Sequence, residues 1–130
     1  MHQWRQADCY SIAKNYYKEG MHFTEPKIHY QGSMQGHAVS EFPILNYTAA
    51  ALWSLFGEFP IWYRSLNYII FCVALLILGM QLNAIYASVF KAWFIVAWLA
   101  STPLLAYYAP NFIADVPAFS FAILAFVLLW

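Results

Sequence analysis

The sequence predicts an all-α integral membrane protein, a polytopic helical bundle with amphipathic helices lying beside the membrane. Of the 130 residues, 63% are hydrophobic and only 9% are charged, whereas a soluble domain carries about a quarter charged residues. Three windows are also apolar over about the 20 residues that a membrane-spanning helix needs. The net charge is zero and there is no basic tract, so nucleic acid is not an expected partner.

Residues 1–42 form a polar leader in which we expect one amphipathic helix, over about residues 7–19. Four side chains recur at the spacing of a single helical face, namely Cys9, Ile12, Ala13 and Tyr16. Charged and polar residues occupy the other side, and Gly20 supplies a helix stop. We expect this helix to lie along the membrane surface with its tyrosines at the depth of the lipid headgroups.

The next apolar stretch, 43–57, is too short to cross a bilayer. It begins with Pro43, which suits the start of a helix, and it ends with Gly57, which favours a helix stop. We therefore expect an interfacial or re-entrant helix here.

Three windows are predicted to span the membrane: 61–82, 92–109 and 112–130. Arg64 and Asp115 lie near one end of 61–82 and 112–130, and Lys91 stands at the entry of 92–109. From these positions a side chain can reach the interface, whereas a charge at mid-membrane costs about 2.5–3.5 kcal/mol on insertion scales. If 43–57 does not cross, residues 1–42 and the turn before 112–130 face the same side of the membrane. If it does cross, they face opposite sides. Most Lys and Arg residues lie in 1–42, which by itself would place that segment in the cytoplasm.

Three acidic residues stand where the chain is predicted to meet the membrane: Asp8, Glu41 and Asp115. Asp8 follows Trp4 and Arg5, and a carboxylate in such surroundings can serve as a general base toward a hydroxyl. Each acid taken alone is also explained as a helix cap or as a first-turn residue that the helix dipole favours. Their expected position on one side of the membrane makes them candidate catalytic residues.

Arg5 and Arg64 are candidates for binding phosphate, because a guanidinium offers a planar fork of donors that matches phosphate oxygens. For Arg64 the alternative is an interfacial anchor whose side chain reaches the lipid headgroups. All four histidines lie within 1–42 at spacings unlike those of a zinc site. There is also no Gly-rich phosphate loop and no nucleophile elbow. The sequence therefore indicates no metal site and no cofactor, and leaves a divalent-metal requirement open.

Three blocks of the sequence carry a family resemblance: "WRQADCYSIAKNYYKEG", "SEFPILNYTAAALWSLFGE" and "YYAPNFIADVPAFSFAILAF". Together they resemble the N-terminal region of the GT-C superfamily of polyprenyl-phosphate-sugar glycosyltransferases, which includes the protein O-mannosyltransferases and the aminoarabinose transferases. The likeness extends over nearly all 130 residues. It departs from the family at Arg5–Gln6, where many relatives carry an Asp-Glu pair, and at Phe42–Pro43, where the family has Pro-Pro.

The resemblance implies transfer of a sugar, with inversion, from a polyprenyl-phosphate donor to an acceptor hydroxyl on the extracytoplasmic side of a bacterial plasma membrane. Asp8 would be the catalytic base, Asp115 the family's second acid, and Glu41 the acid that precedes the second surface helix. Arg5 and Lys14 would hold the donor phosphate. The expected partners are membrane lipid, the lipid-linked donor and a glycan, lipid or protein acceptor.

The same resemblance places residues 1–42 outside the cytoplasm, against the count of basic residues. It also implies that the family's first span precedes residue 1, so that the chain is a fragment of a longer enzyme, truncated in its last span. The alternative is a non-catalytic polytopic membrane protein, either a transporter fragment or an inactive glycosyltransferase-like scaffold. A transporter predicts polar residues near the bilayer midplane, whereas the middles of the predicted spans hold almost no charge.

Overall fold

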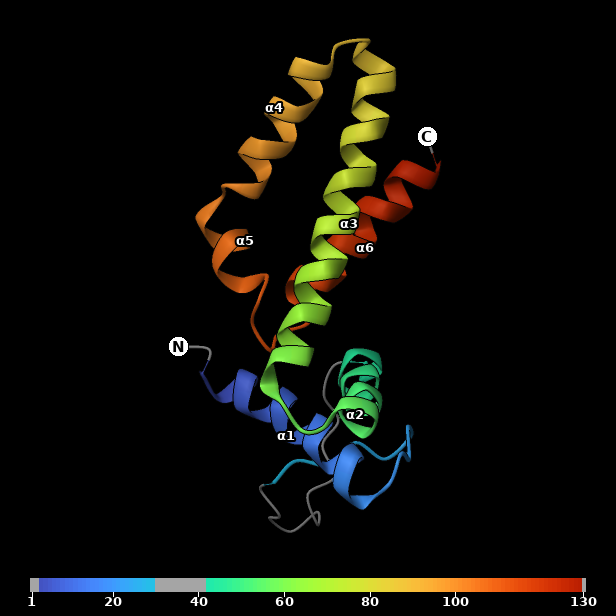
Figure 1. Cartoon of the computed structure of the whole chain (residues 1–130), viewed down its shortest axis with the longest axis vertical. Helices are drawn as coiled ribbons and strands as arrows, with labels where there is room; N and C mark the ends of the chain where they lie inside the picture. The colour runs from blue at the N-terminus through green and yellow to red at the C-terminus, as the bar shows by residue number, and fades with distance from the viewer. Residues whose placement is uncertain (1–2, 30–41, 130) are drawn as a thin grey trace. The chain divides into compact units, whose positions relative to one another are not determined.

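The computed structural model describes residues 3–29 and 42–129, and within these ranges the chain is all-α, as predicted. The helices, coloured along the chain in Figure 1, are α1 (Gln3–Glu19), α2 (Ile44–Phe56), α3 (Pro60–Tyr86), α4 (Val89–Ala100), α5 (Pro103–Tyr108) and α6 (Asp115–Leu129). They belong to two compact units. The first comprises Met1–Leu66 with Phe112–Ala114, and the second comprises Asn67–Asn111 with Asp115–Trp130.

The first unit is built on the packing of α1 against α2. The four side chains of the predicted apolar face of α1 are all buried, and Ile12 and Tyr16 pack with Ala50 of α2. Burying one side chain of this size contributes roughly 1.5–3 kcal/mol. Ala49 and Ala50 are fully buried, and their small side chains let the two helices approach closely. The apolar face that recurs with the helical period in α1 is thus the face that packs against α2.

Helix α1 begins four residues earlier than the sequence suggests, at Gln3 instead of about residue 7. Nothing in the segment that follows Gln3 interrupts a helix, because Arg and Gln are good helix formers and no Pro or Gly is present. The helix ends at Glu19, and Gly20 follows with a φ of 111°, a backbone conformation that suits glycine. The earlier start changes the role that the helix can give to Asp8.

Helix α2 covers most of the stretch 43–57. Pro43 precedes its first residue, and Gly57 follows its last residue with a φ of 92° and donates its backbone N–H to the Trp53 carbonyl oxygen at 2.9 Å. Its 13 residues correspond to a length of about 20 Å. That is shorter than the roughly 30 Å hydrocarbon core of a bilayer, so α2 cannot cross it as a helix.

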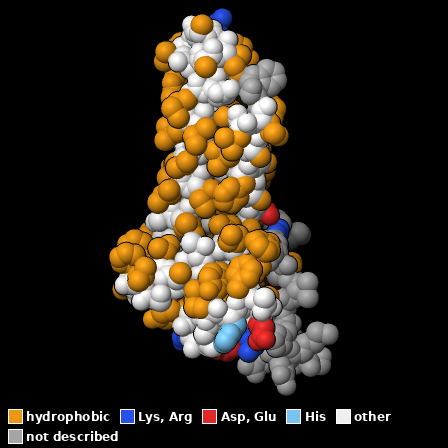
Figure 2. Space-filling view, turned by 90° about the vertical axis from the view of Figure 1, so that its right-hand side faces the viewer, with side chains coloured by type: hydrophobic (Ala, Val, Ile, Leu, Met, Phe, Trp, Pro, Cys, Tyr) orange, Lys and Arg blue, Asp and Glu red, His pale blue; other side chains and the backbone are white. Residues whose placement is uncertain are grey.

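The second unit is dominated by α3, which begins in the first unit and continues through Tyr86. Among the residues described, α3 alone is long and apolar enough to cross a membrane, judged by length and composition. It forms an antiparallel pair with α4, and the two helices join at the Ala87–Ser88 connection (Figure 1). A small core unites the elements of this unit: Phe71, Leu75, Val96, Ala109 and Val116. On the face drawn in Figure 2, hydrophobic side chains are spread over the surface of the unit, between stretches of backbone and other side chains.

Two of the three predicted spans differ from the observed helices. The window 92–109 is divided into α4 and α5 at Ser101–Thr102, because Pro103 has no N–H to continue the helix and its ring clashes with the preceding turn. The window 112–130 contains α6, which has 15 residues and begins only at Asp115. Each of these helices is shorter than the roughly 17–25 residues of a typical span, so the polytopic arrangement stays a prediction.

Candidate functional site

Asp8 lies in the second turn of α1, where it is half-buried. The cap or first-turn explanation for this acid is wrong, because the helix begins at Gln3 and its first turn contains no acidic residue. The Ser11 hydroxyl donates a hydrogen bond to the backbone carbonyl oxygen of Asp8, with 2.9 Å between the two oxygen atoms. Its carboxylate has no hydrogen bond or ion pair to any residue in the described ranges 3–29 and 42–129.

The two proposed phosphate-binding cations lie on opposite sides of α1. A helix turns by about 100° per residue, so Arg5 is displaced by about 60° from Asp8, and Lys14 by about 120° in the other direction. Nine residues also separate Arg5 from Lys14, which is about 14 Å along the axis. Arg5 thus shares a side of the helix with Asp8, and Lys14 does not.

Lys14 has a partner within the first unit. Its Nζ atom lies 2.6 Å from Oε1 of Glu58 in the connection between α2 and α3. This hydrogen bond raises the pKa of Lys14 and lowers that of Glu58. Lys18 and a hydrogen bond from Tyr10 lower the pKa of Glu58 further. The ion pair joins α1 to the α2–α3 connection. The sequence analysis did not predict this pairing and instead expected Lys14 to hold the donor phosphate.

An aromatic cluster adjoins this ion pair through Tyr10, whose ring centroid lies 5.9 Å from Nζ of Lys14. The Tyr10 ring lies edge-on to both Trp53 and Phe112, with centroids 5.3 Å apart in each case. Phe112 also lies edge-on to Tyr63 at 5.2 Å, and the Arg64 guanidinium stands 5.0 Å from the Phe112 centroid. An arginine in this position gains a cation–π interaction. The Arg64 side chain is exposed, so its donors can still reach an anion.

One buried polar contact fixes α2 to the start of α3. The Tyr63 hydroxyl donates a hydrogen bond to Oδ1 of Asn46, and both residues are buried. Nearby, the Trp53 indole donates to the Phe59 carbonyl oxygen at 2.9 Å. Together these bonds hold α2 against α3 without using a residue of the proposed chemistry.

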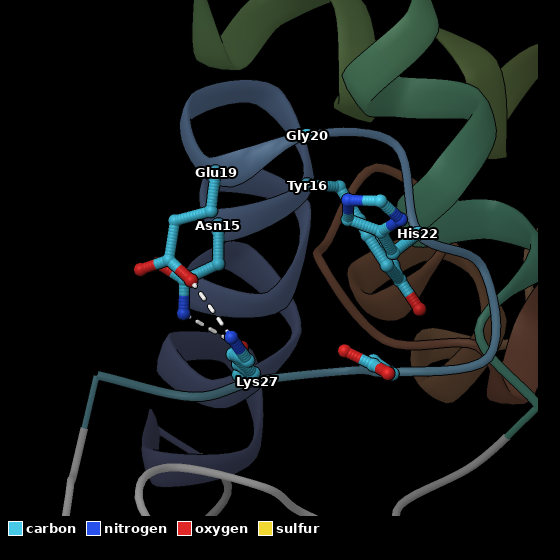
Figure 3. Close-up of a pocket in the computed structure, with 7 residues that line it drawn as sticks. Asn15, Tyr16, Glu19, Gly20, His22 and Lys27 are labelled. Carbon is cyan, nitrogen blue, oxygen red and sulfur yellow. Dashed lines mark hydrogen bonds and ion pairs between the residues drawn. The ribbon is translucent and has the colours of Figure 1, made fainter.

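A shallow pocket opens beside the end of α1 (Figure 3). It is lined by Asn15, Tyr16, Glu19, Gly20, His22, Glu25 and Lys27. Most of its polar groups hold the loop in place: Asn15 donates to the Lys27 carbonyl oxygen at 2.7 Å, and Lys27 pairs with Glu19 at 3.4 Å. Burial raises the pKa of Tyr16, whose hydroxyl donates to the Phe23 carbonyl oxygen. The part of the chain that is described holds no group of three or more His, Cys, Asp or Glu side chains placed to bind a metal.

No family model, curated protein or solved structure matches this chain. Any function therefore has to follow from the residues themselves.

Neither of the other two predicted acids, Glu41 and Asp115, is described as part of the first unit with Asp8. Asp115 is the exposed first residue of α6, in the second unit, where the dipole of the helix favours a negative charge. Glu41 lies outside the described residues. The convergence of Asp8, Glu41 and Asp115 on one side of a membrane thus stays a prediction.

Proposed function

We propose that this chain belongs to a membrane glycosyltransferase of the GT-C type, which transfers a sugar from a polyprenyl-phosphate donor to an acceptor hydroxyl outside the cytoplasm. Asp8 is the catalytic base in this proposal, and Arg5 is the cation that contacts the donor phosphate. We place the chain as part of a polytopic protein of the bacterial plasma membrane.

The observation that carries the proposal is the position of Asp8. A half-buried carboxylate inside a helix, with no partner among the described residues, neither caps the helix nor forms a structural ion pair. A carboxylate that is still reached by solvent and has no structural role in the helix can accept the proton of a bound hydroxyl. Arg5 lies on the same side of α1, three residues earlier, so an acid and a cation are presented together.

A lipid-linked substrate also suits the kinds of helix that are present. Helices α1 and α2 are too short or too polar to cross a bilayer, whereas α3 is long and apolar. A polyprenyl tail partitions among apolar spans, and its sugar phosphate then lies at the level of surface helices. Holding the donor at a fixed depth lowers the entropic cost of the reaction.

The proposed reaction is a single displacement. Asp8 accepts the proton of the acceptor hydroxyl while the oxygen forms a bond to the anomeric carbon. The bond between that carbon and the donor phosphate breaks, and polyprenyl phosphate leaves with the electron pair. Arg5 stabilises the negative charge that develops on the phosphate. One displacement inverts the configuration at the anomeric carbon.

The test is a transfer assay on membranes that contain the intact gene product, with a panel of radiolabelled polyprenyl-phosphate sugars. General base catalysis contributes about 10²–10⁴-fold, so Asp8→Asn should lower the transfer rate at least about 100-fold while photo-crosslinking to the donor persists. Glu25→Gln is the matched control, because it removes the same charge from an exposed position of the same unit and should leave transfer unchanged. Unchanged turnover of Asp8→Asn would remove Asp8 from this role. Absence of transfer from every donor would favour the non-catalytic alternative.

A further inference from the structure

One polar side chain interrupts the apolar stripe along which α3 packs in the second unit. Asn67, Phe71 and Leu75 recur at intervals of four residues, so they lie on one side of the helix. Phe71 and Leu75 belong to the core of the unit. Asn67 is 0% exposed, which makes it more completely buried than either of them. An apolar side chain would fill this position without burying polar atoms, so packing alone does not explain the asparagine.

Asn67 forms a hydrogen bond to the connection between α5 and α6. Its Nδ2 atom donates to the Asn111 backbone carbonyl oxygen at 2.7 Å, across 44 positions of the sequence. Its Oδ1 atom is buried and has no hydrogen-bond partner within 3–29 and 42–129. A buried acceptor without a partner destabilises the folded state and offsets what the bond to Asn111 contributes. The effect of the residue is therefore to fix the position of Asn111 and adds little net stability.

The connection that Asn67 holds leads directly to Asp115. Asn111 also bonds locally, because its Nδ2 atom donates to the Tyr107 carbonyl oxygen at 2.9 Å. On the other side of Asp115, Val116 is buried in the core of the second unit. Asp115 itself is exposed. Its backbone thus lies between two anchored residues, while its side chain stays accessible.

We propose that Asn67 is a positioning residue, which holds the α5–α6 connection so that the Asp115 carboxylate keeps one place in the reaction. The proposal rests on the proposed transferase function, with Asp115 as the predicted second acid. A displacement of about 1 Å at a reacting group can lower a rate about 100-fold. Without the hydrogen bond to Asn111, the connection moves more freely, and Asp115 occupies its reactive position for a smaller fraction of the time.

The experiment compares Asn67→Leu, Asn67→Ala and Asp115→Asn in the intact gene product, together with the double variant of Asn67→Leu and Asp115→Asn. The two Asn67 variants remove the donor with a larger and a smaller side chain, so an effect that they share comes from the lost hydrogen bond. Ser120→Ala is the matched control, because Ser120 is also 0% exposed in the second unit and donates only within its own helix, to the Val116 carbonyl oxygen at 2.8 Å. The kcat and KM of transfer are measured with the radiolabelled donors. Hydrogen exchange of the backbone amides in 109–114 measures the anchoring itself.

We expect both Asn67 variants to lower kcat at least about tenfold with KM unchanged. Both should also speed amide exchange in 109–114, and Ser120→Ala should change neither quantity. If Asn67 acts through Asp115, Asn67→Leu causes no further loss of kcat in a protein that already carries Asp115→Asn. A merely structural role predicts instead that the two losses multiply.

Losses that multiply, or unchanged amide exchange in 109–114, would overturn the positioning role. Normal transfer by the Asn67 variants or by Asp115→Asn, with transfer lost in Asp8→Asn, would overturn that role and leave the proposed function intact. Absence of transfer by the unchanged protein from every donor would overturn the proposed function and the positioning role together. The two failures are therefore distinguishable.

Discussion

The buried hydrogen bond between Tyr63 and Asn46 should be one of the strongest single polar contributions to the stability of the first unit. Tyr63 is 1% exposed and Asn46 is 6% exposed, so water cannot replace the Tyr63 hydroxyl once it is removed. Tyr63→Phe leaves Oδ1 of Asn46 buried without this donor, which costs about 1–3 kcal/mol. Since 1.4 kcal/mol corresponds to about a tenfold change, the unfolding equilibrium constant should rise about 5- to 150-fold.

The assay is equilibrium unfolding of the purified protein in detergent micelles, followed by tryptophan fluorescence. Tyr107→Phe is the control, because Tyr107 is 65% exposed and its substitution should stay within about 0.5 kcal/mol. In a double-mutant cycle, Tyr63→Phe combined with Asn46→Leu should cost less than the two single changes added together, with a coupling of about 0.5–3 kcal/mol. A Tyr63→Phe change as small as that of the control would refute the argument from burial.

Three other changes test the packing and charge of the described residues. Acidification below the ordinary pKa of Glu58, about 4.5, should remove what its ion pair with Lys14 contributes to the free energy of unfolding. A carboxyl whose pKa is lowered by folding stabilises the folded state above its ordinary pKa, and this stabilisation is lost as the pH falls through the lowered pKa. The loss should not exceed about 1 kcal/mol, since the pair is partly exposed, and it should be absent from a pH titration of unfolding in Glu58→Gln. Gly79→Val should lower the unfolding free energy by about 1–3 kcal/mol, because even a Cβ atom there meets the Trp93 ring at 3.1 Å; Gly79→Ala should cost less in the same denaturant titration. Gly20→Ala should cost at least about 1 kcal/mol because of the φ of 111°, and an unchanged unfolding midpoint would contradict that strain.

The features that the sequence predicts well depend on residues close together in the chain. The face of α1 that holds Ile12 and Tyr16 repeats with the helical period, and it is buried as that pattern requires. The stop after α2 follows from Gly57 alone. The division of 92–109 was not predicted, although its cause is local: Pro103 removes an N–H in the middle of an apolar run. Composition alone, averaged over the window, conceals that interruption.

The features that the sequence could not predict join distant segments. Nothing near Lys14 indicates that Glu58 will lie 2.6 Å from it, because the pairing depends on how α1 meets the α2–α3 connection. The donor–acceptor pair of Tyr63 and Asn46 likewise requires two helices to be placed against each other. The neighbours of Asp8 in the sequence single it out as a candidate, and only the observed start of α1 at Gln3 removes the capping explanation.

The most direct test of the central claim is the side of the membrane from which positions beside Asp8 and at Asp115 are labelled. Ala7→Cys and Asp115→Cys, both at exposed positions, are treated with an impermeant maleimide in sealed vesicles of known orientation. If α2 rests on the membrane surface and the acids share one compartment, both cysteines react from the extracytoplasmic side. Reaction of the two cysteines from opposite sides would contradict the account, because Asp8 and Asp115 could not then serve one site.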